Sequence, residues 1–212
     1  LCADNGVVAQ GVSQTDASVT RAVLQNLAAR RTSVCQMAAA AHCSVVPVDM
    51  GIAGAPVPGV QDCRIAPGTK DFTCGPAMTR AQAVQAIGCG IALVRGQKQQ
   101  GVQLLATGEM GIGNTTTSSA VASVLLGAPV QSAVRLCPAA AKAVFASHVS
   151  AEPAAHMVLD ALGKAPLITA NLHLGEGTGA VASIPLWDMA LAVYRGCYSF
   201  AEGGIAPYTP QC

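Results

Sequence analysis

The chain has 212 residues, of which 51% are hydrophobic and 11% charged, and its formal net charge is +1 at pH 7. This length suits one domain with a substantial core, and the apolar composition excludes a disordered chain. No basic block is present, so nucleic acid is not an expected partner. The abundance of Ala, Val and Gly favours close packing of helices on a sheet.

Neither a membrane span nor a disulfide framework is expected. Polar residues, Gly or Pro interrupt every apolar run well before the ~18 residues that a span requires, although mean hydropathy is +0.44. The nine cysteines are odd in number and form no CxxC pair. We therefore expect buried free thiols in a reducing cytoplasm rather than a zinc ribbon. No Met precedes Leu1, and we expect the sequence to be part of a longer protein.

The first quarter of the chain reads as strand, helix, helix, strand. After an opening strand, Asp16 is the expected N-cap of a helix over 17–29, with Val19, Val23 and Leu27 on one face. A second helix is expected over 33–42. The β-branched run from Ser44 to Val48 predicts a buried parallel strand.

The remainder continues the alternation after a long Gly- and Pro-rich excursion over 51–78. Thr79 is the expected cap of a helix that extends to residue 99 and carries apolar residues at helical spacing, namely Ala83, Ile87, Ile91 and Val94. Strands are expected over 103–107 and 167–172. Further helices are expected after residue 115 to residue 126, over 138–147, over 151–162, and from the segment 175–179 through residue 194, before a loosely held tail over 195–212.

Alternation of strands and helices predicts an α/β fold with a mostly parallel sheet. Two glycine-flanked glutamates follow expected strands: Glu109 after residues 104–107 and Glu176 after residues 172–174. Ligands of such sheets bind beyond the carboxyl ends of the strands. The free N–H groups of a following helix favour a phosphate there, and a glutamate in a dry pocket is suited to act as a base. These features indicate a nucleotide-handling enzyme, although simple helix capping is the alternative for each segment.

The segment 147–152, Ser-His-Val-Ser-Ala-Glu, has two interpretations. His148, Glu152 and His156 have the spacing of metal ligands on one helix face. If the helix breaks at Ser150, that serine is instead an N-cap and His148 lies outside the helix. We favour the cap. His42 and His173 are expected to be structural histidines of the core or surface.

Several motifs resemble those of the nicotinate-nucleotide–dimethylbenzimidazole phosphoribosyltransferase family. They extend from residue 1 almost to Tyr194, and the most specific are 108–116, GEMGIGNTT, and 174–179, LGEGTG. The other matching segments are 3–8, 11–13, 48–52, 76–79 and 147–152. The resemblance implies a Rossmann-like parallel sheet, a smaller helical domain, a homodimer, and no cofactor or metal.

The resemblance also implies a reaction and roles for individual residues. Phosphoribose would pass from nicotinate mononucleotide to 5,6-dimethylbenzimidazole, giving α-ribazole 5′-phosphate and nicotinate. Glu176 would be the general base, and Glu109 would lie in the same active site. Ser13 would line the base pocket. The remaining expected substrate-binding residues are Gly111, Gly113, Asn114, Thr115, Ser150, Leu174, Gly175 and Gly177.

The chain departs from the family pattern in its middle and at its start. Family members carry further elements between the helix that ends near Leu126 and the segment that begins at Arg135, including a basic residue near the phosphate. They also carry an N-terminal helical region that precedes the motif at residues 3–8. We expect the smaller helical domain to be partly missing from this sequence by omission rather than by true deletion. A true deletion would remove strands and activity.

Two other functions remain open. The first is a catalytically inactive relative that binds nucleotides or azoles and keeps both glutamates. The second is an unrelated nucleotide-dependent oxidoreductase, for which no residue pattern argues. The preferred azole is not specified by the sequence, because an apolar pocket accepts several.

Overall fold

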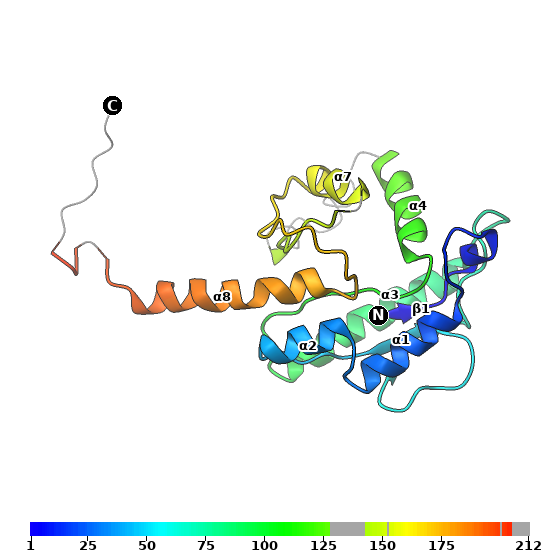
Figure 1. Ribbon diagram of the computed structural model, residues 1–212, viewed down its shortest axis with the longest axis horizontal. Helices are drawn as coiled ribbons and strands as arrows, with labels where there is room; N and C mark the ends of the chain where they lie inside the picture. The colour runs from blue at the N-terminus through cyan, green and yellow to red at the C-terminus, as the bar shows by residue number, and fades with distance from the viewer. Residues whose placement is uncertain (128–142, 152, 200, 205–212) are drawn as a thin grey trace.

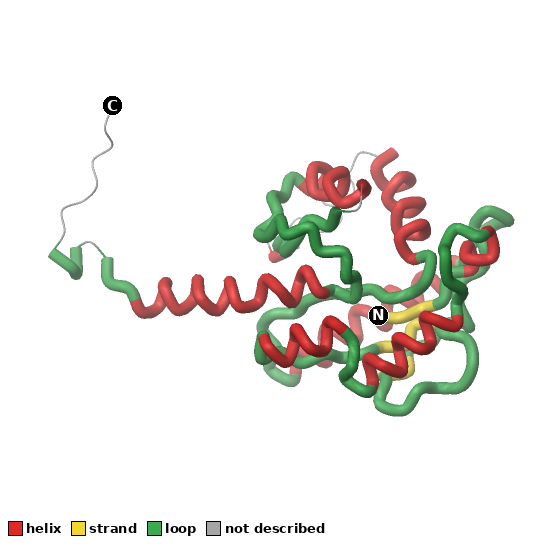
Figure 2. The backbone as a smooth tube through the Cα atoms, in the orientation of Figure 1, coloured by secondary structure: helices red, strands yellow, loops and turns green. Residues whose placement is uncertain are grey.

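The computed structural model describes residues 1–127, 143–151, 153–199 and 201–204. A small parallel sheet lies at its centre, formed by β1 (Cys2–Ala3), β2 (Val48–Gly51) and β3 (Gln61–Asp62) in the order β1-β2-β3. Cys2 pairs with Asp49, and Val48 pairs with Gln61. Figure 2 shows these short strands in yellow among helices and long loops. The expected α/β fold, a parallel sheet flanked by helices, is confirmed.

Six α-helices and one 3-10 helix are described around the sheet. They are η1 (Gly6–Gln10), α1 (Ser18–Ala28), α2 (Ser33–Ala40), α3 (Arg80–Gln99), α4 (Asn114–Gly127), α7 (Pro153–Leu162) and α8 (Thr178–Gly196). Of the helix expected over 138–147, residues 138–142 lie outside the described residues, and residues 144–147 are not helical, so the helix does not reach its predicted end. Thr79 caps α3 as predicted, and its hydroxyl accepts a hydrogen bond from the N–H of Gln82 (3.2 Å) in a complete capping box.

The core lies where α1 and α2 cover the beginning of the sheet. Its buried residues come from α1, α2, β1, the loop after β2 and the first turn of α8, namely Leu24, Leu27, Val34, Cys35, Ala38, Cys2, Ile52, Val57 and Val181. The buried face of α1 is formed by Thr20, Leu24 and Leu27. Of the apolar face expected for α1, Leu27 is therefore buried, whereas Val19 and Val23 are only half-buried.

Two local predictions at the start of the chain need correction. The N-cap of α1 is Ala17 rather than Asp16, but the Asp16 carboxylate still accepts a hydrogen bond from the N–H of Ser18 (2.8 Å). The hydrogen bonds from Ser18 lower the pKa of Asp16. The second strand begins at Val48 rather than at Ser44, since Pro47 has no N–H to donate to a neighbouring strand.

The two later expected strands are not formed as predicted. Residues 103–107 have no regular secondary structure, and within the described part of the chain no backbone hydrogen bond joins them to another strand. Leu104 and Leu105 are 50% and 44% exposed. Residues 167–172 make one isolated bridge, between Ile168 and His148. A strand exists only where a partner continues the ladder, and a periodic sequence alone does not supply that partner.

Long helices leave much apolar surface uncovered. No residue of α3 is buried, and the expected apolar face, including Ile87, Ile91 and Val94, is exposed. The C-terminal half of α8 projects away from the rest of the molecule (Figure 1). Its base is held by contacts with α2 and by the ring of Trp187, which meets Phe145 edge to face at 4.5 Å.

The cysteines are less buried than expected. Seven lie among the described residues as free thiols; Cys2 and Cys35 are buried, whereas Cys74 and Cys197 are exposed. Cys137 and Cys212 lie outside the described residues.

No helix in the described ranges is long and apolar enough to cross a membrane. The helix α8 continues to Gly196, so the expected boundary at residue 194 falls inside it.

Asp49 is the polar residue on which the turn after β2 depends. Its side chain is 3% exposed, and one carboxylate oxygen accepts hydrogen bonds from the N–H groups of Gly51 (3.0 Å) and Ile52 (2.8 Å). Asp49→Ala should lower the free energy of unfolding by about 2–4 kcal/mol, because it leaves buried donors without acceptors. Urea unfolding measures this loss. Arg64 forms ion pairs with Asp49 (3.8 Å) and with the exposed Asp62 (2.6 Å), so Asp62→Ala is the control. An equal loss in both variants would contradict the prediction.

Candidate active site

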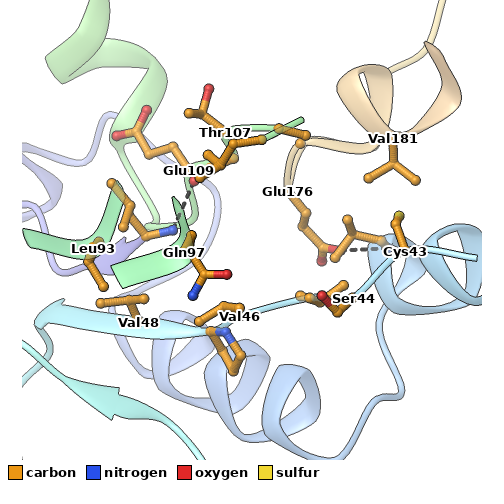
Figure 3. Close-up of a pocket in the computed structure, with 18 of the residues that line it drawn as sticks. Cys43, Ser44, Val46, Val48, Leu93, Gln97, Thr107, Glu109, Glu176 and Val181 are labelled. Carbon is orange, nitrogen blue, oxygen red and sulfur yellow. Dashed lines mark hydrogen bonds between the residues drawn. The ribbon is translucent and has the colours of Figure 1, made fainter. Parts of the chain in front are cut away.

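A cavity of about 610 Å³ opens at the edge of the sheet beside the two glycine-flanked glutamates. Its walls come from residues 42–48, from one face of α3, from residues 102–110 and from the start of α8 (Figure 3). Most of the lining is apolar, with Val46, Val48 and Leu93 on one side and Val181 on the other. Glu109, Glu176 and Gly177 are the expected site residues that line it.

The two glutamate segments meet through their backbones. A Cβ added at Gly108 would lie 2.5 Å from the carbonyl oxygen of Glu176, and one added at Gly177 would lie 2.9 Å from the Cα of Gly108. Only glycine allows chains to approach this closely. Two motifs that are 67 positions apart in sequence, at Glu109 and Glu176, are therefore neighbours in the fold.

Glu176 has an uncommon backbone conformation. Its φ is +56°, between Gly175 at +65° and Gly177 at +84°, so three successive residues are left-handed. A non-glycine residue in this region is strained by about 1–2 kcal/mol. The turn aims the Glu176 side chain into the cavity, where its carboxylate accepts a hydrogen bond from the N–H of Val34 (3.2 Å) in the first turn of α2. A helix N-terminus stabilises an anion of this kind.

The side chain of Glu109 takes another direction. Its carboxylate accepts a hydrogen bond from the hydroxyl of Ser118 (3.3 Å) in α4. In Figure 3 the side chain of Glu176 points toward Cys43 and Ser44, whereas that of Glu109 points away from them. Both residues line one cavity, but their carboxylates diverge.

The expected phosphate-binding residues lie at the N-terminus of α4, outside the cavity lining. Asn114 begins the helix, and its side-chain oxygen accepts a hydrogen bond from the N–H of Thr115 (2.8 Å). Gly111 is buried, and Gly113 has φ +82° at the turn into the helix. These residues lie together in one loop at the start of the helix.

The other expected contacts are more scattered. The Ser13 hydroxyl accepts a weak hydrogen bond from the N–H of Thr15 (3.4 Å) in the loop before α1, and Ser13 does not line the cavity. Leu174 is 52% exposed. Ser150, Leu174 and Gly175 are also absent from the cavity lining.

The favoured interpretation placed His148 outside a helix, and the structure agrees, because residues 144–150 are not helical. However, α7 begins at Pro153, so Ser150 lies three residues before the helix rather than at its cap. The His148 ring packs against Gly179 at the start of α8, and burial lowers its pKa. Glu152 lies outside the described residues, and no group of three or more metal-ligating side chains occurs in the ranges described. Of the other histidines, His42 lines the cavity and His173 is exposed.

Several cavity residues could not be identified from the sequence. The N–H of Val34 is a backbone donor, and because nearly every residue has one, the sequence does not indicate which N–H contacts Glu176. Gln97 and Ser44 also line the cavity, from α3 and from the segment before β2. Cys2 forms part of the wall, and burial raises the pKa of its thiol, which the nearby Asp49 and Glu176 raise further, against an opposing effect of the N-terminal ammonium group.

Comparison with known proteins agrees with this geometry. A family model described as "Phosphoribosyltransferase" matches residues 1–134 and 128–205. The nicotinate-nucleotide–dimethylbenzimidazole phosphoribosyltransferase of Ruminiclostridium cellulolyticum is 32% identical to the chain, over 99% of this chain and 82% of the relative. The chain belongs to this phosphoribosyltransferase family. The enzyme of the same name from Acetivibrio thermocellus is 30% identical over 100% of this chain and 82% of its own length.

A solved structure shows the same fold. The crystal structure of the nicotinate-nucleotide–dimethylbenzimidazole phosphoribosyltransferase from Thermus thermophilus has a TM-score of 0.90 and 29% identity, and the match covers 98% of this chain and 84% of that one. A second structure from the same organism has a TM-score of 0.89. The resemblance predicted from the two glycine-rich motifs is therefore confirmed.

The comparisons also locate a gap inside the chain. The alignment with the Ruminiclostridium relative extends over 287 positions, and this chain has 212 residues, which leaves at least 75 positions without a counterpart. The family model matches in two pieces that share residues 128–134. The family segment that is missing here therefore falls at that point, as the departure between Leu126 and Arg135 suggested.

The backbone crossing at Gly108 and Gly177 generates a prediction. Gly108→Ala should force the two glutamate segments apart, since its Cβ would overlap the Glu176 carbonyl oxygen. We expect a stability loss of about 1–3 kcal/mol and at least about a tenfold loss of any activity. Thermal unfolding and turnover measure these effects.

Gly88→Ala is the matched control for this variant. Nothing lies within 4 Å of a Cβ added at Gly88 in the middle of α3. Because alanine favours the helix, the control should gain about 0.5–1 kcal/mol. If Gly108→Ala were as stable as Gly88→Ala, the close crossing would not exist in solution.

Proposed function

We propose that the protein transfers phosphoribose from nicotinate mononucleotide to 5,6-dimethylbenzimidazole, giving α-ribazole 5′-phosphate and nicotinate, in assembly of the nucleotide loop of cobalamin. The names of the relatives support this reaction. The observation that carries it is the single cavity that holds Glu176 among apolar walls. A flat, largely apolar base suits such walls, and a carboxylate at their edge can accept its N–H proton.

Glu176 is the proposed general base. One nitrogen of the benzimidazole attacks C1 of the ribose, while the proton on the other nitrogen passes to the carboxylate. Nicotinate departs from the opposite face, so the β-nucleotide becomes the α-product. The left-handed turn and the N–H of Val34 hold the carboxylate in the cavity before the substrates arrive.

Glu109 is the proposed stabiliser of positive charge on the ribose as nicotinate departs. The backbone of the preceding residue, Gly108, lies against Gly177, but the Glu109 carboxylate accepts a hydrogen bond from the Ser118 hydroxyl. This role therefore requires a change of side-chain rotamer that brings the carboxylate over the cavity. Gly111, Gly113, Asn114 and Thr115, at the start of α4, are proposed to bind the phosphate, because a helix N-terminus favours an anion.

The remaining site residues are proposed from the family resemblance. Ser13 lines the base pocket, Ser150 contacts the phosphate, and Leu174, Gly175 and Gly177 shape the turn around Glu176. No metal ion or cofactor takes part in the proposed reaction. The chain is proposed to work in the cytoplasm as a single catalytic domain over residues 1–194 with a tail over 195–212.

A second candidate is a catalytically inactive relative that still binds nucleotide or azole. Two observations favour it: at least 75 positions of the relative have no counterpart here, and the two carboxylates diverge. Full-length family sequence in the gap would complete the sheet beside residues 103–107. The test below therefore separates binding from turnover.

Glu176→Gln should abolish formation of α-ribazole 5′-phosphate, because the amide cannot accept the proton. A loss of at least about 10³-fold is expected, and calorimetry should show that nicotinate mononucleotide still binds. Glu202→Gln is the control, since Glu202 lies in the tail and its carboxylate contacts Ser199. Near-normal turnover by Glu176→Gln would contradict the role. Binding without product in the unmodified protein would favour the inactive relative.

We also propose that the protein is a homodimer that covers the projecting half of α8. This half exposes Met189, Leu191, Val193 and Tyr194, which are 56%, 45%, 61% and 86% exposed. Within the described ranges these side chains remain exposed, and an isolated helix of this kind gains little stability without a packing partner. A second copy of the same helix buries them.

Replacing both Met189 and Val193 with Lys should convert the dimer into a monomer, because it places charges in the apolar contact. Sedimentation velocity should show the change at concentrations where the unmodified protein remains dimeric. Gln25→Lys is the control, as it adds the same charge to an exposed position of α1. A monomeric unmodified protein, or a doubly substituted protein that stays dimeric, would exclude this interface.

A further inference from the structure

The two peptide units that flank Ile112, in the loop before α4, are each held by a side chain. The N–H of Ile112 donates to the hydroxyl of Thr20 (3.0 Å), and the carbonyl oxygen of Ile112 accepts from the side-chain amide of Asn5 (3.1 Å). Thr20 lies in α1 and is fully buried, and Asn5 follows β1 and is 9% exposed. The loop therefore depends on two side chains that are about 90–110 positions away in sequence.

The side-chain oxygen of Asn5 contacts α4. Its oxygen accepts a hydrogen bond from the hydroxyl of Thr117 (3.0 Å), in the first turn of α4. Asn5 thus uses its donor on the loop and its acceptor on the helix, a pairing that no other common side chain of this size reproduces. Its orientation is fixed by the two contacts together.

We propose that Asn5 and Thr20 are positioning residues that set the conformation of the glycine-rich loop for the substrate phosphate. This inference rests on the proposed function of the same loop. The N–H of the 111–112 peptide is held by Thr20, and the carbonyl group of the 112–113 peptide is held by Asn5, so neither group is free to turn toward a ligand. Within the described ranges the N–H groups of Gly113 and Thr116, which are not buried, have no hydrogen-bond partner, and these are the donors that the loop presents.

Backbone hydrogen bonds to β1 hold the residue that follows Glu109. The N–H of Ala3 donates to the carbonyl oxygen of Met110 (3.1 Å), and the N–H of Met110 donates to the carbonyl oxygen of Leu1 (2.9 Å). Residues on both sides of Gly111 are therefore tied to β1 and to the residues that follow it. Glu109 lies at one end of this tied segment, next to the crossing with Gly177. Loss of the hydrogen bonds to Ile112 would let the backbone rotate at Gly111 and Gly113. The N–H groups proposed to bind the phosphate would then change direction before Glu109 moves.

Thr20→Val tests the clamp, because valine has the same shape but no hydroxyl. The KM for nicotinate mononucleotide should rise about tenfold or more, while kcat and the KM for dimethylbenzimidazole change by less than about threefold. Thr20→Ser restores the acceptor and should return the KM to within about twofold of the unmodified protein. Asn5→Asp turns an acceptor toward the Ile112 carbonyl oxygen and should raise the same KM at least as much.

Amide hydrogen exchange provides a readout that does not need turnover. The Ile112 amide should be protected in the unmodified protein and should exchange at least about tenfold faster in Thr20→Val. Thr32→Val removes another buried hydroxyl, which contacts Cys35 instead, and should leave Ile112 exchange unchanged. Unchanged Ile112 exchange in Thr20→Val, or a Thr20→Ser variant as impaired as Thr20→Val, would overturn the inference. If the unmodified protein made no product, the exchange result alone would decide whether the clamp exists.

Discussion

The contact between Gly108 and Gly177 is the constraint on which the candidate site depends. Each glycine precedes or follows a glutamate, and their backbones are too close for any larger residue at either position. The contact brings the end of the segment 103–107 against the start of α8. The cavity, the carboxylate of Glu176 and the loop before α4 all take their places from this crossing. A small error in their separation would be costly for catalysis, because reacting groups must be held at near-contact distances.

The local parts of the fold could be predicted from the sequence. The capping box at Thr79 and the glycines that surround Glu176 act over three or four residues, so their effect is visible in the chain. The helices α2, α3, α4, α7 and α8 were found close to their predicted bounds for the same reason. The family itself was identified from two short motifs, since glycine-flanked glutamates at strand ends combine backbone geometry with chemistry.

Features that depend on distant partners could not be predicted. The segment 103–107 has the composition of a strand, but a strand also needs a neighbour, and the chain lacks at least 75 positions of its relative. The divergence of the Glu109 and Glu176 carboxylates depends on Ser118 and on the N–H of Val34, and no residue pattern near either glutamate indicates these partners. The exposed apolar faces of α3 and α8 likewise look like core in the sequence, because periodicity shows which residues share a face and not what covers it.

The central claim is that the cavity beside the Gly108–Gly177 crossing is where the base and the nucleotide meet. Co-crystallisation with dimethylbenzimidazole and nicotinate mononucleotide tests it most directly. Electron density should show the benzimidazole ring between the apolar walls, with one ring nitrogen within about 2.6–3.2 Å of the Glu176 carboxylate. Density for the ring at any other place on the molecule, with this cavity empty, would contradict the account.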